Sequence, residues 1–129
     1  MAQESVSAER RKILVVDDQP MLTKAIRRML SDHEVITVTC AREAIARIES
    51  GERYDIILSD LMMPGVSGME LRDTLERVAP DQVCRMVFMT GGAFTAKARE
   101  FFERVNNPTI EKPFDKAQLF KVIDTLLPH

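Results

Sequence analysis

The sequence has few cysteines, and neither has a second cysteine or a histidine at the spacing of a metal site. Cys40 and Cys84 each stand within an apolar or weakly polar run. A disulfide framework or a zinc motif needs more of these residues at closer spacing. We therefore interpret both thiols as reduced packing residues, which is typical of a reducing compartment.

Charge of neither sign is in excess. The 129 residues include 18 lysines and arginines against 20 aspartates and glutamates, which gives a formal net charge of −2. Proteins that bind DNA or RNA through a basic face need a local cluster of positive charge, and no such cluster stands out in the sequence. Nucleic acid is therefore not expected as a direct partner.

Long hydrophobic runs are also missing. No apolar stretch approaches the roughly 20 residues that cross a bilayer, and Met1 to Lys12 lack the apolar centre of a signal peptide. We predict a cytoplasmic protein with no membrane partner. It is expected to be one domain over residues 12–129 after a polar leader or linker, residues 1–11. A domain of this length holds a core without disulfides or a structural metal.

Short apolar runs alternate with longer amphipathic ones along the chain. The short runs predict buried strands at residues 13–16, 35–39, 56–58, 86–89 and 109–111. The amphipathic runs predict helices at residues 20–31, 41–50, 68–79, 95–105 and 116–126. Ser67 and Glu70 have the spacing of a capping box, and Pro80 is expected to end the third helix.

This strict alternation of five strands and five helices predicts an α/β fold. The expected architecture is a doubly wound, five-stranded parallel sheet with right-handed crossovers and helices on both faces. The second strand is less apolar than the others, so we expect it at an edge of the sheet.

Polar side chains stand where the predicted strands end. Asp17 and Asp18 follow the first strand, Asp60 the third, Thr90 the fourth and Lys112 the fifth. In such a sheet the functional site lies at the carboxyl ends of the strands. An isolated aspartate after a strand is more often a turn residue or a helix cap. Three carboxylates, a hydroxyl and an amine at one crevice together favour a site.

Carboxylates that approach one another need a cation between them. At ~4 Å, Asp18 and Asp60 would repel by on the order of 4 kcal/mol at an effective dielectric constant of 20. Mg²⁺ is a suitable cation, because it prefers oxygen ligands and often binds one or two carboxylates together with a phosphate. Asp60 is the candidate nucleophile toward phosphorus, since the loop 61–67 after it leaves room for a donor in line. Lys112 would neutralise a phosphoryl oxygen, and Thr90 would donate its hydroxyl to the new phosphoryl group.

The motifs that carry these residues together resemble the receiver domain of two-component response regulators, including the chemotaxis regulators. They read ILVVDDQP, DIILSDLMMPGVSGMEL, MTGG and EKPF, within about residues 12–127. The resemblance implies a flavodoxin-like fold with strand order 2-1-3-4-5. It also implies a phosphoryl group taken by Asp60 from a histidine kinase or a histidine phosphotransfer domain.

The same resemblance assigns roles to single positions. Asp18 looks like the direct Mg²⁺ ligand, Asp17 acts largely through a water, and the main-chain carbonyl of Met62 is a further ligand beside Asp60. Thr90 and Lys112 match the hydroxyl and the cation that bind the phosphoryl group, and the bond after Lys112 is expected to be cis. The family usually has an aromatic residue where this chain has Thr109, so this chain lacks the side chain of the usual aromatic switch.

Two other protein classes are alternatives. An aspartyl-phosphate phosphatase dependent on Mg²⁺ would carry a DxDx[TV] signature, but Leu61 and Met62 follow Asp60. A flavodoxin-like flavin binder would need a phosphate loop rich in Ser, Thr and Gly, where Asp17 and Asp18 would repel the phosphate. Both alternatives fit less well than a signalling module with self-catalysed phosphotransfer and dephosphorylation.

Two settings stay open for such a module. It is either a stand-alone regulator that acts through protein contacts or the receiver of a hybrid sensor histidine kinase. The MTGG and EKPF segments resemble those of receivers attached to such kinases, and the polar leader fits a linker, so the second setting is favoured.

Overall fold

The computed structural model describes residues 10–92 and 95–127. Of the expected leader, residues 1–11, only residues 10 and 11 are among the described residues. The strands are β1 (Lys12–Val16), β2 (Glu34–Val38), β3 (Ile56–Asp60), β4 (Met86–Thr90) and β5 (Thr109–Glu111). The helices are α1 (Pro20–Met29), α2 (Ala41–Glu49), α3 (Gly68–Val78), α4 (Pro80–Val83), α5 (Ala96–Arg104) and α6 (Lys116–Asp124).

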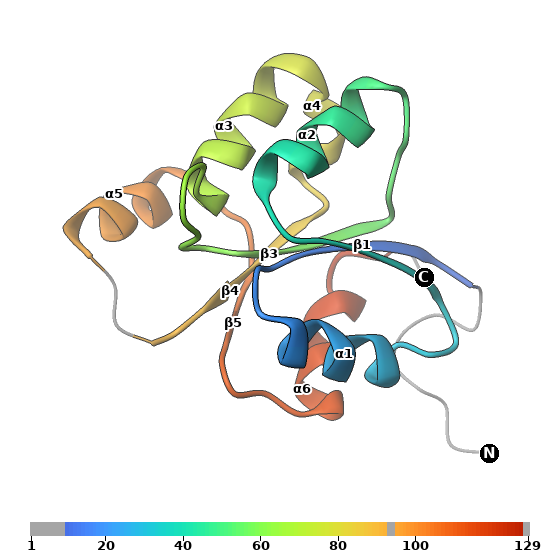
Figure 1. The fold of residues 1–129 in the computed structure, drawn as a ribbon. Helices are drawn as coiled ribbons and strands as arrows, with labels where there is room; N and C mark the ends of the chain where they lie inside the picture. Colours follow the sequence, from blue (N-terminus) through green and yellow to red (C-terminus); the bar gives the residue numbers. More distant parts are fainter. Residues whose placement is uncertain (1–9, 93–94, 128–129) are drawn as a thin grey trace.

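The five strands form one parallel sheet in the order β2-β1-β3-β4-β5, which confirms the predicted architecture and the edge position of β2. Helices α2, α3, α4 and α5 cover one face and α1 and α6 the other (Figure 1). Alternate side chains of β1 enter the two cores: Leu14 packs with α2 and α3, and Ile13 with α1 and α6. Every residue of β3 and β4 is buried, because both strands are central and covered on both faces.

The described residues contain six helices, one more than predicted. Pro80 was expected only to end a helix, but it also begins the short helix α4. Proline suits this position, because the first turn of a helix leaves its N–H groups unpaired. The buried side chain of Gln82 bonds α4 to the segment before β3: its Oε1 accepts the Tyr54 N–H at 2.9 Å, and its Nε2 donates to the Tyr54 carbonyl at 3.2 Å.

The interpretation of both cysteines as packing residues is wrong for Cys84. Both thiols are free, but Cys84 is exposed, since it stands at the end of the unpredicted helix α4. Cys40 is half-buried just before α2. Only Cys40 is therefore in a position to contribute to packing.

His33 gives the fold a predictable pH dependence. Its Nδ1 accepts the main-chain N–H of Arg11 at 2.9 Å, and burial lowers its pKa below the usual 6.5 despite the opposing charge of Asp32. The unfolded chain therefore binds a proton at a higher pH than the folded protein. The contribution of His33 to the free energy of unfolding is therefore complete above about pH 6.5. It is expected to be lost progressively as the pH falls below that value.

Urea unfolding at about pH 5.5 and about pH 7.5 measures this loss. The variant His33→Asn keeps an acceptor near the Arg11 N–H and should show a smaller loss of stability at the lower pH. His129→Asn, which removes the only other histidine, is the control and should behave as the native chain. An equal loss in native protein and His33→Asn contradicts the assignment.

Candidate functional site

Three carboxylates meet at the carboxyl ends of β1 and β3. Asp17 and Asp18 follow β1, and Asp60 is the last residue of β3. Asp17 and Asp60 are buried, whereas Asp18 is exposed. One oxygen from each of the three side chains lies within 4.8 Å of the other two. The structure thus brings together the acidic residues that the sequence singled out, and this cluster could bind a metal ion.

Lys112 supplies the positive charge of the site from the end of β5. Its Nζ lies 3.1 Å from Oδ2 of Asp17 and 3.3 Å from Oδ1 of Asp60. Its main-chain N–H donates to the Thr90 carbonyl at 2.8 Å, so the residue is fastened to the end of β4. Thr90 is buried beside it. Four neighbouring strand ends therefore converge on one place, and the bond between Lys112 and Pro113 is cis.

Three carboxylates share the single ammonium group of Lys112 in this cluster. Burial raises the pKa of Asp60 above its ordinary value, and the negative charge of Asp17 adds to the rise although Lys112 opposes it. Asp17 is held in place at both oxygens, because Oδ1 accepts the Gln19 N–H at 2.8 Å while Oδ2 faces Lys112. A further cation would relieve the remaining repulsion, and the all-oxygen donor set suits a hard divalent ion.

The loop after Asp60 is fixed by the start of α3. The Leu61 N–H donates to the Met89 carbonyl at 3.0 Å, and the Gly68 N–H donates to the Leu61 carbonyl at 2.9 Å. Ser67 and Glu70 form the predicted capping box at this helix start. A Cβ atom on Gly68 would lie 2.3 Å from the Asp60 carbonyl oxygen. Sequence reasoning missed this role of Gly68, because only the fold brings α3 onto the backbone of Asp60.

Two exposed apolar side chains stand close to the site in the chain. Met21, in the first turn of α1, is 81% exposed, and Met62, two residues after Asp60, is 52% exposed. The third large exposed apolar residue in the described part of the chain is Val78, at the far end of α3. Thr109, where the resemblance implies an aromatic residue, is exposed at the start of β5.

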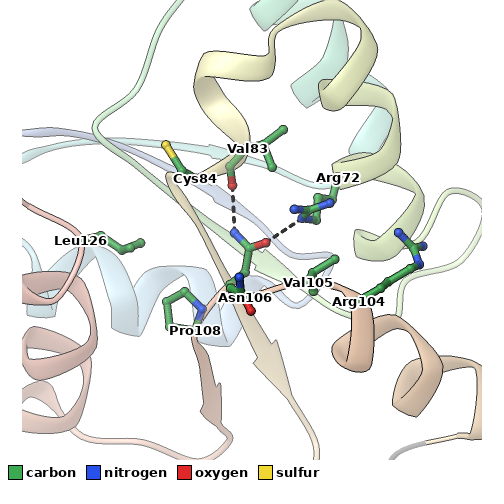
Figure 2. Close-up of a pocket in the computed structure, with 9 residues that line it drawn as sticks. Arg72, Val83, Cys84, Arg104, Val105, Asn106, Pro108 and Leu126 are labelled. Atoms are coloured by element: carbon green, nitrogen blue, oxygen red, sulfur yellow. Dashed lines mark hydrogen bonds between the residues drawn. The ribbon is translucent and has the colours of Figure 1, made fainter.

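A separate hollow of about 340 Å³ lies at the opposite end of the sheet (Figure 2). Its lining includes Val83 and Cys84 before β4 and Val105 and Pro108 before β5. These residues mark the amino ends of the strands, whereas the acidic cluster is at their carboxyl ends. The hollow is therefore no part of the candidate site. In residues 10–92 and 95–127, no helix has the length and apolar character needed to cross a bilayer.

Comparison with known proteins gives a consistent result. The family model of the response regulator receiver domain matches residues 13–124. The transcriptional regulatory protein BtsR of Escherichia coli is 31% identical over 119 residues, which are 89% of this chain and 47% of that protein. This chain covers between 26% and 53% of the length of several curated relatives.

Solved structures agree with this fold. The chemotaxis response regulator CheY4 of Vibrio cholerae is similar with a TM-score of 0.78 and 26% identity, over 92% of this chain and 100% of that chain. The receiver domain of the sensor histidine kinase PA1611 of Pseudomonas aeruginosa has a TM-score of 0.76 and 25% identity, over 92% of this chain and 98% of that chain. That structure holds a magnesium ion coordinated in its active site cleft.

Proposed function

The chain belongs to the response regulator receiver domain family, and on that premise we propose that Asp60 accepts a phosphoryl group in a Mg²⁺-dependent reaction. The donor would be a phosphohistidine of a histidine kinase or a histidine phosphotransfer domain. One observation carries the proposal: the buried Asp60 carboxylate lies within reach of two further carboxylates and 3.3 Å from the Lys112 ammonium. The module would signal through protein contacts that change with phosphorylation.

The donor set fits the proposed metal. Asp18 is exposed and would be a direct ligand, whereas Asp17, whose two oxygens already have donors, would act largely through a water. A carboxylate oxygen of Asp60 and the main-chain carbonyl of Met62 would be the remaining protein ligands of the metal ion. When bound, Mg²⁺ would neutralise charge on the phosphoryl oxygens.

The chain's own residues account for the rest of the chemistry. An oxygen of Asp60 attacks phosphorus, the bond between phosphorus and the donor nitrogen breaks, and its electron pair stays on the imidazole. Lys112 compensates charge on the transferred group, and the Thr90 hydroxyl donates to it. Gly91 leaves space beside Thr90, since a Cβ atom at this position would meet nothing within 4 Å.

The setting of this reaction is part of the proposal. We infer a cytoplasmic receiver domain over residues 12–129 that follows a leader or linker, residues 1–11. The likeness to the receiver of a sensor histidine kinase supports a place in a hybrid kinase, and the likeness to CheY4 supports a stand-alone regulator.

Intact-mass measurement after incubation with a small phosphodonor tests the proposal. The native chain should gain one phosphoryl group with Mg²⁺ and none with a chelator. Asp60→Asn should gain none. The matched control Asp115→Asn changes an exposed aspartate that caps α6, and it should be phosphorylated as the native chain is. Phosphorylation of Asp60→Asn at the native rate would overturn the proposal.

Met21 offers a separate prediction about the donor protein. An apolar side chain that is 81% exposed and follows Asp18 by three residues suits contact with a protein surface. Met21→Glu is expected to slow transfer from a phosphohistidine protein about tenfold, the usual size for one good interface contact. Transfer from a small phosphodonor should stay within about twofold, since it needs no protein contact.

Val78→Glu is the matched control for Met21→Glu. It places the same charge on another exposed apolar position, about 15 Å along α3 from the end next to Asp60. This variant should transfer as the native chain does with both donors. Equal slowing of the two donors by Met21→Glu would show damage to the site instead of lost docking.

A further inference from the structure

Strand β5, which ends just before Lys112, is the shortest strand of the sheet. Strand β5 has three residues, pairs only with β4 and has only Ile110 buried. Yet Lys112, the next residue, must reach Asp17 and Asp60 at 3.1 and 3.3 Å. A slip of one residue along β4 would move it by about 3.3 Å and turn its side chain to the other face. The main chain does join the two strands here, since the Phe88 N–H donates to the Pro108 carbonyl at 3.0 Å, but so short a strand has few such bonds to hold the register.

One ladder bond between β4 and β5 is impossible for the main chain. Bonds from β5 to β4 recur every second residue in a parallel pair, and the Lys112 N–H donates to the Thr90 carbonyl. Four residues earlier on both strands, the same ladder would join residue 108 to the Met86 carbonyl. Residue 108 is a proline, which has no N–H to donate.

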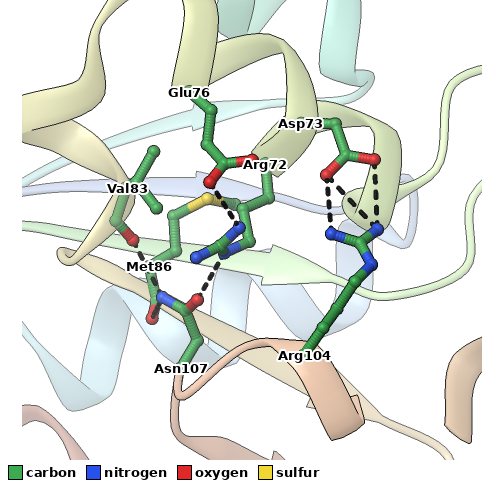
Figure 3. Close-up of polar contacts among 7 residues, drawn as sticks. All are labelled: Arg72, Asp73, Glu76, Val83, Met86, Arg104 and Asn107. Atoms are coloured by element: carbon green, nitrogen blue, oxygen red, sulfur yellow. Dashed lines mark hydrogen bonds and ion pairs between the residues drawn. The ribbon is translucent and has the colours of Figure 1, made fainter. Parts of the chain in front are cut away.

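The side chain of Asn107 makes that bond instead. Its Nδ2 donates to the Met86 carbonyl at 3.0 Å and to the Val83 carbonyl at 2.8 Å. Its Oδ1 accepts from Nε of Arg72 at 2.6 Å, and Arg72 is held in turn by Glu76 at 3.3 Å. Figure 3 shows this amide between α3 and the start of β4. Both ends of the amide therefore have partners, so its orientation is fixed.

We infer that Asn107 is a positioning residue for Lys112. The amide replaces the bond that Pro108 cannot make and so sets the start of β5 against the start of β4. Since β5 is only three residues long, the register set at its start determines where Lys112 stands at its end. The inference rests on the proposed function for its effect on phosphorylation, but its structural part does not depend on that function.

Hydrogen exchange and phosphorylation of Asn107→Ala test the inference together. The Lys112 amide should exchange about tenfold faster relative to the Leu61 amide, which bonds β3 to β4 in the same molecule. The saturated rate of phosphorylation by a small phosphodonor should fall about tenfold, while the half-saturating Mg²⁺ concentration stays within about twofold because no carboxylate has changed.

The matched control is Gln82→Met. It removes another side-chain amide that bonds two main-chain groups, but both groups belong to Tyr54, which precedes β3, and neither belongs to β5. It should leave the exchange ratio and the saturated rate unchanged. If Asn107→Ala does not fold, Asn107→Asp keeps the acceptor for Arg72, loses the two donated bonds and places a carboxylate oxygen against the two carbonyls.

Each outcome decides the question. Effects in the Asn107 variant without effects in Gln82→Met support the inference. Equal effects in both variants, no effect in either, or a slower rate with an unchanged Lys112 exchange ratio overturn it. If even the native chain is not phosphorylated, the proposed function fails, and the exchange ratio still decides whether Asn107 sets the register.

Discussion

Replacing Lys112 by methionine is expected to lower the saturated rate of phosphorylation about 10²- to 10³-fold, the usual size of the loss when one preorganised donor to developing negative charge is removed. Methionine keeps much of the side-chain length and loses the charge. The Lys112 ammonium is the cation that the structure places between Asp17 and Asp60, at 3.1 and 3.3 Å. Without this ammonium group, one of the positive charges that compensate the negative phosphoryl oxygens is missing. Rates at saturating donor and Mg²⁺ measure the loss.

The same variant separates two roles of Lys112. If Lys112 only compensates charge, its removal leaves the carboxylates more negative, and the affinity for Mg²⁺ should hold or rise. Calorimetric titration with Mg²⁺ measures this affinity. Lys112→Arg is the control. It keeps the positive charge but replaces the compact ammonium group by a planar guanidinium group. Its rate is expected to lie between those of the native chain and Lys112→Met. Loss of Mg²⁺ binding in Lys112→Met would mean that the lysine instead organises the carboxylates.

Replacing Gly68 by alanine is expected to lower the free energy of unfolding by about 2 kcal/mol, as at overpacked positions. The new Cβ would lie 2.3 Å from the Asp60 carbonyl oxygen and 3.1 Å from the Cα atom of Leu61. Both neighbours are backbone, so the first turn of α3 and the Asp60 loop must separate. Phosphorylation should slow as well, because this backbone carries the Asp60 carboxylate. Urea unfolding and the small-donor rate measure the two effects.

Gly91→Ala is the matched control for stability. A Cβ atom at Gly91 would meet nothing within 4 Å, and a glycine replaced without strain usually raises stability by about 0.4–1 kcal/mol. The two alanine variants should therefore change the free energy of unfolding in opposite directions. If Gly68→Ala is as stable as the native chain, the prediction is wrong. The backbone would then accommodate a Cβ atom beside the Asp60 carbonyl without a measurable cost.

Most of the fold follows from the sequence, because the sheet is buried on both faces. Residues 13–16 of β1 form a continuous apolar run, and the strand ends where Asp17 follows. The convergence of Asp17, Asp60 and Lys112 follows in turn, since parallel strands end on the same edge. Helix α4 was missed because Pro80 both ends one helix and begins the next.

The supports of the site could not be predicted in this way. The contact of Gly68 with the Asp60 carbonyl and the bond from Asn107 to the Met86 carbonyl join residues that only tertiary packing brings together. A glycine in a helix and an asparagine before a proline have ordinary local explanations in sequence. The exposure of Met21 likewise depends on which side of α1 faces the sheet.

Chemical mapping of the phosphorylated residue tests the central claim most directly. Borohydride reduces an aspartyl phosphate to homoserine, so peptide mass mapping after treatment with phosphodonor, Mg²⁺ and borohydride locates the acceptor. We expect homoserine at position 60 alone, and none when Mg²⁺ is chelated. Homoserine at Asp17 or Asp18, or at no position in protein that has bound Mg²⁺, would contradict the account.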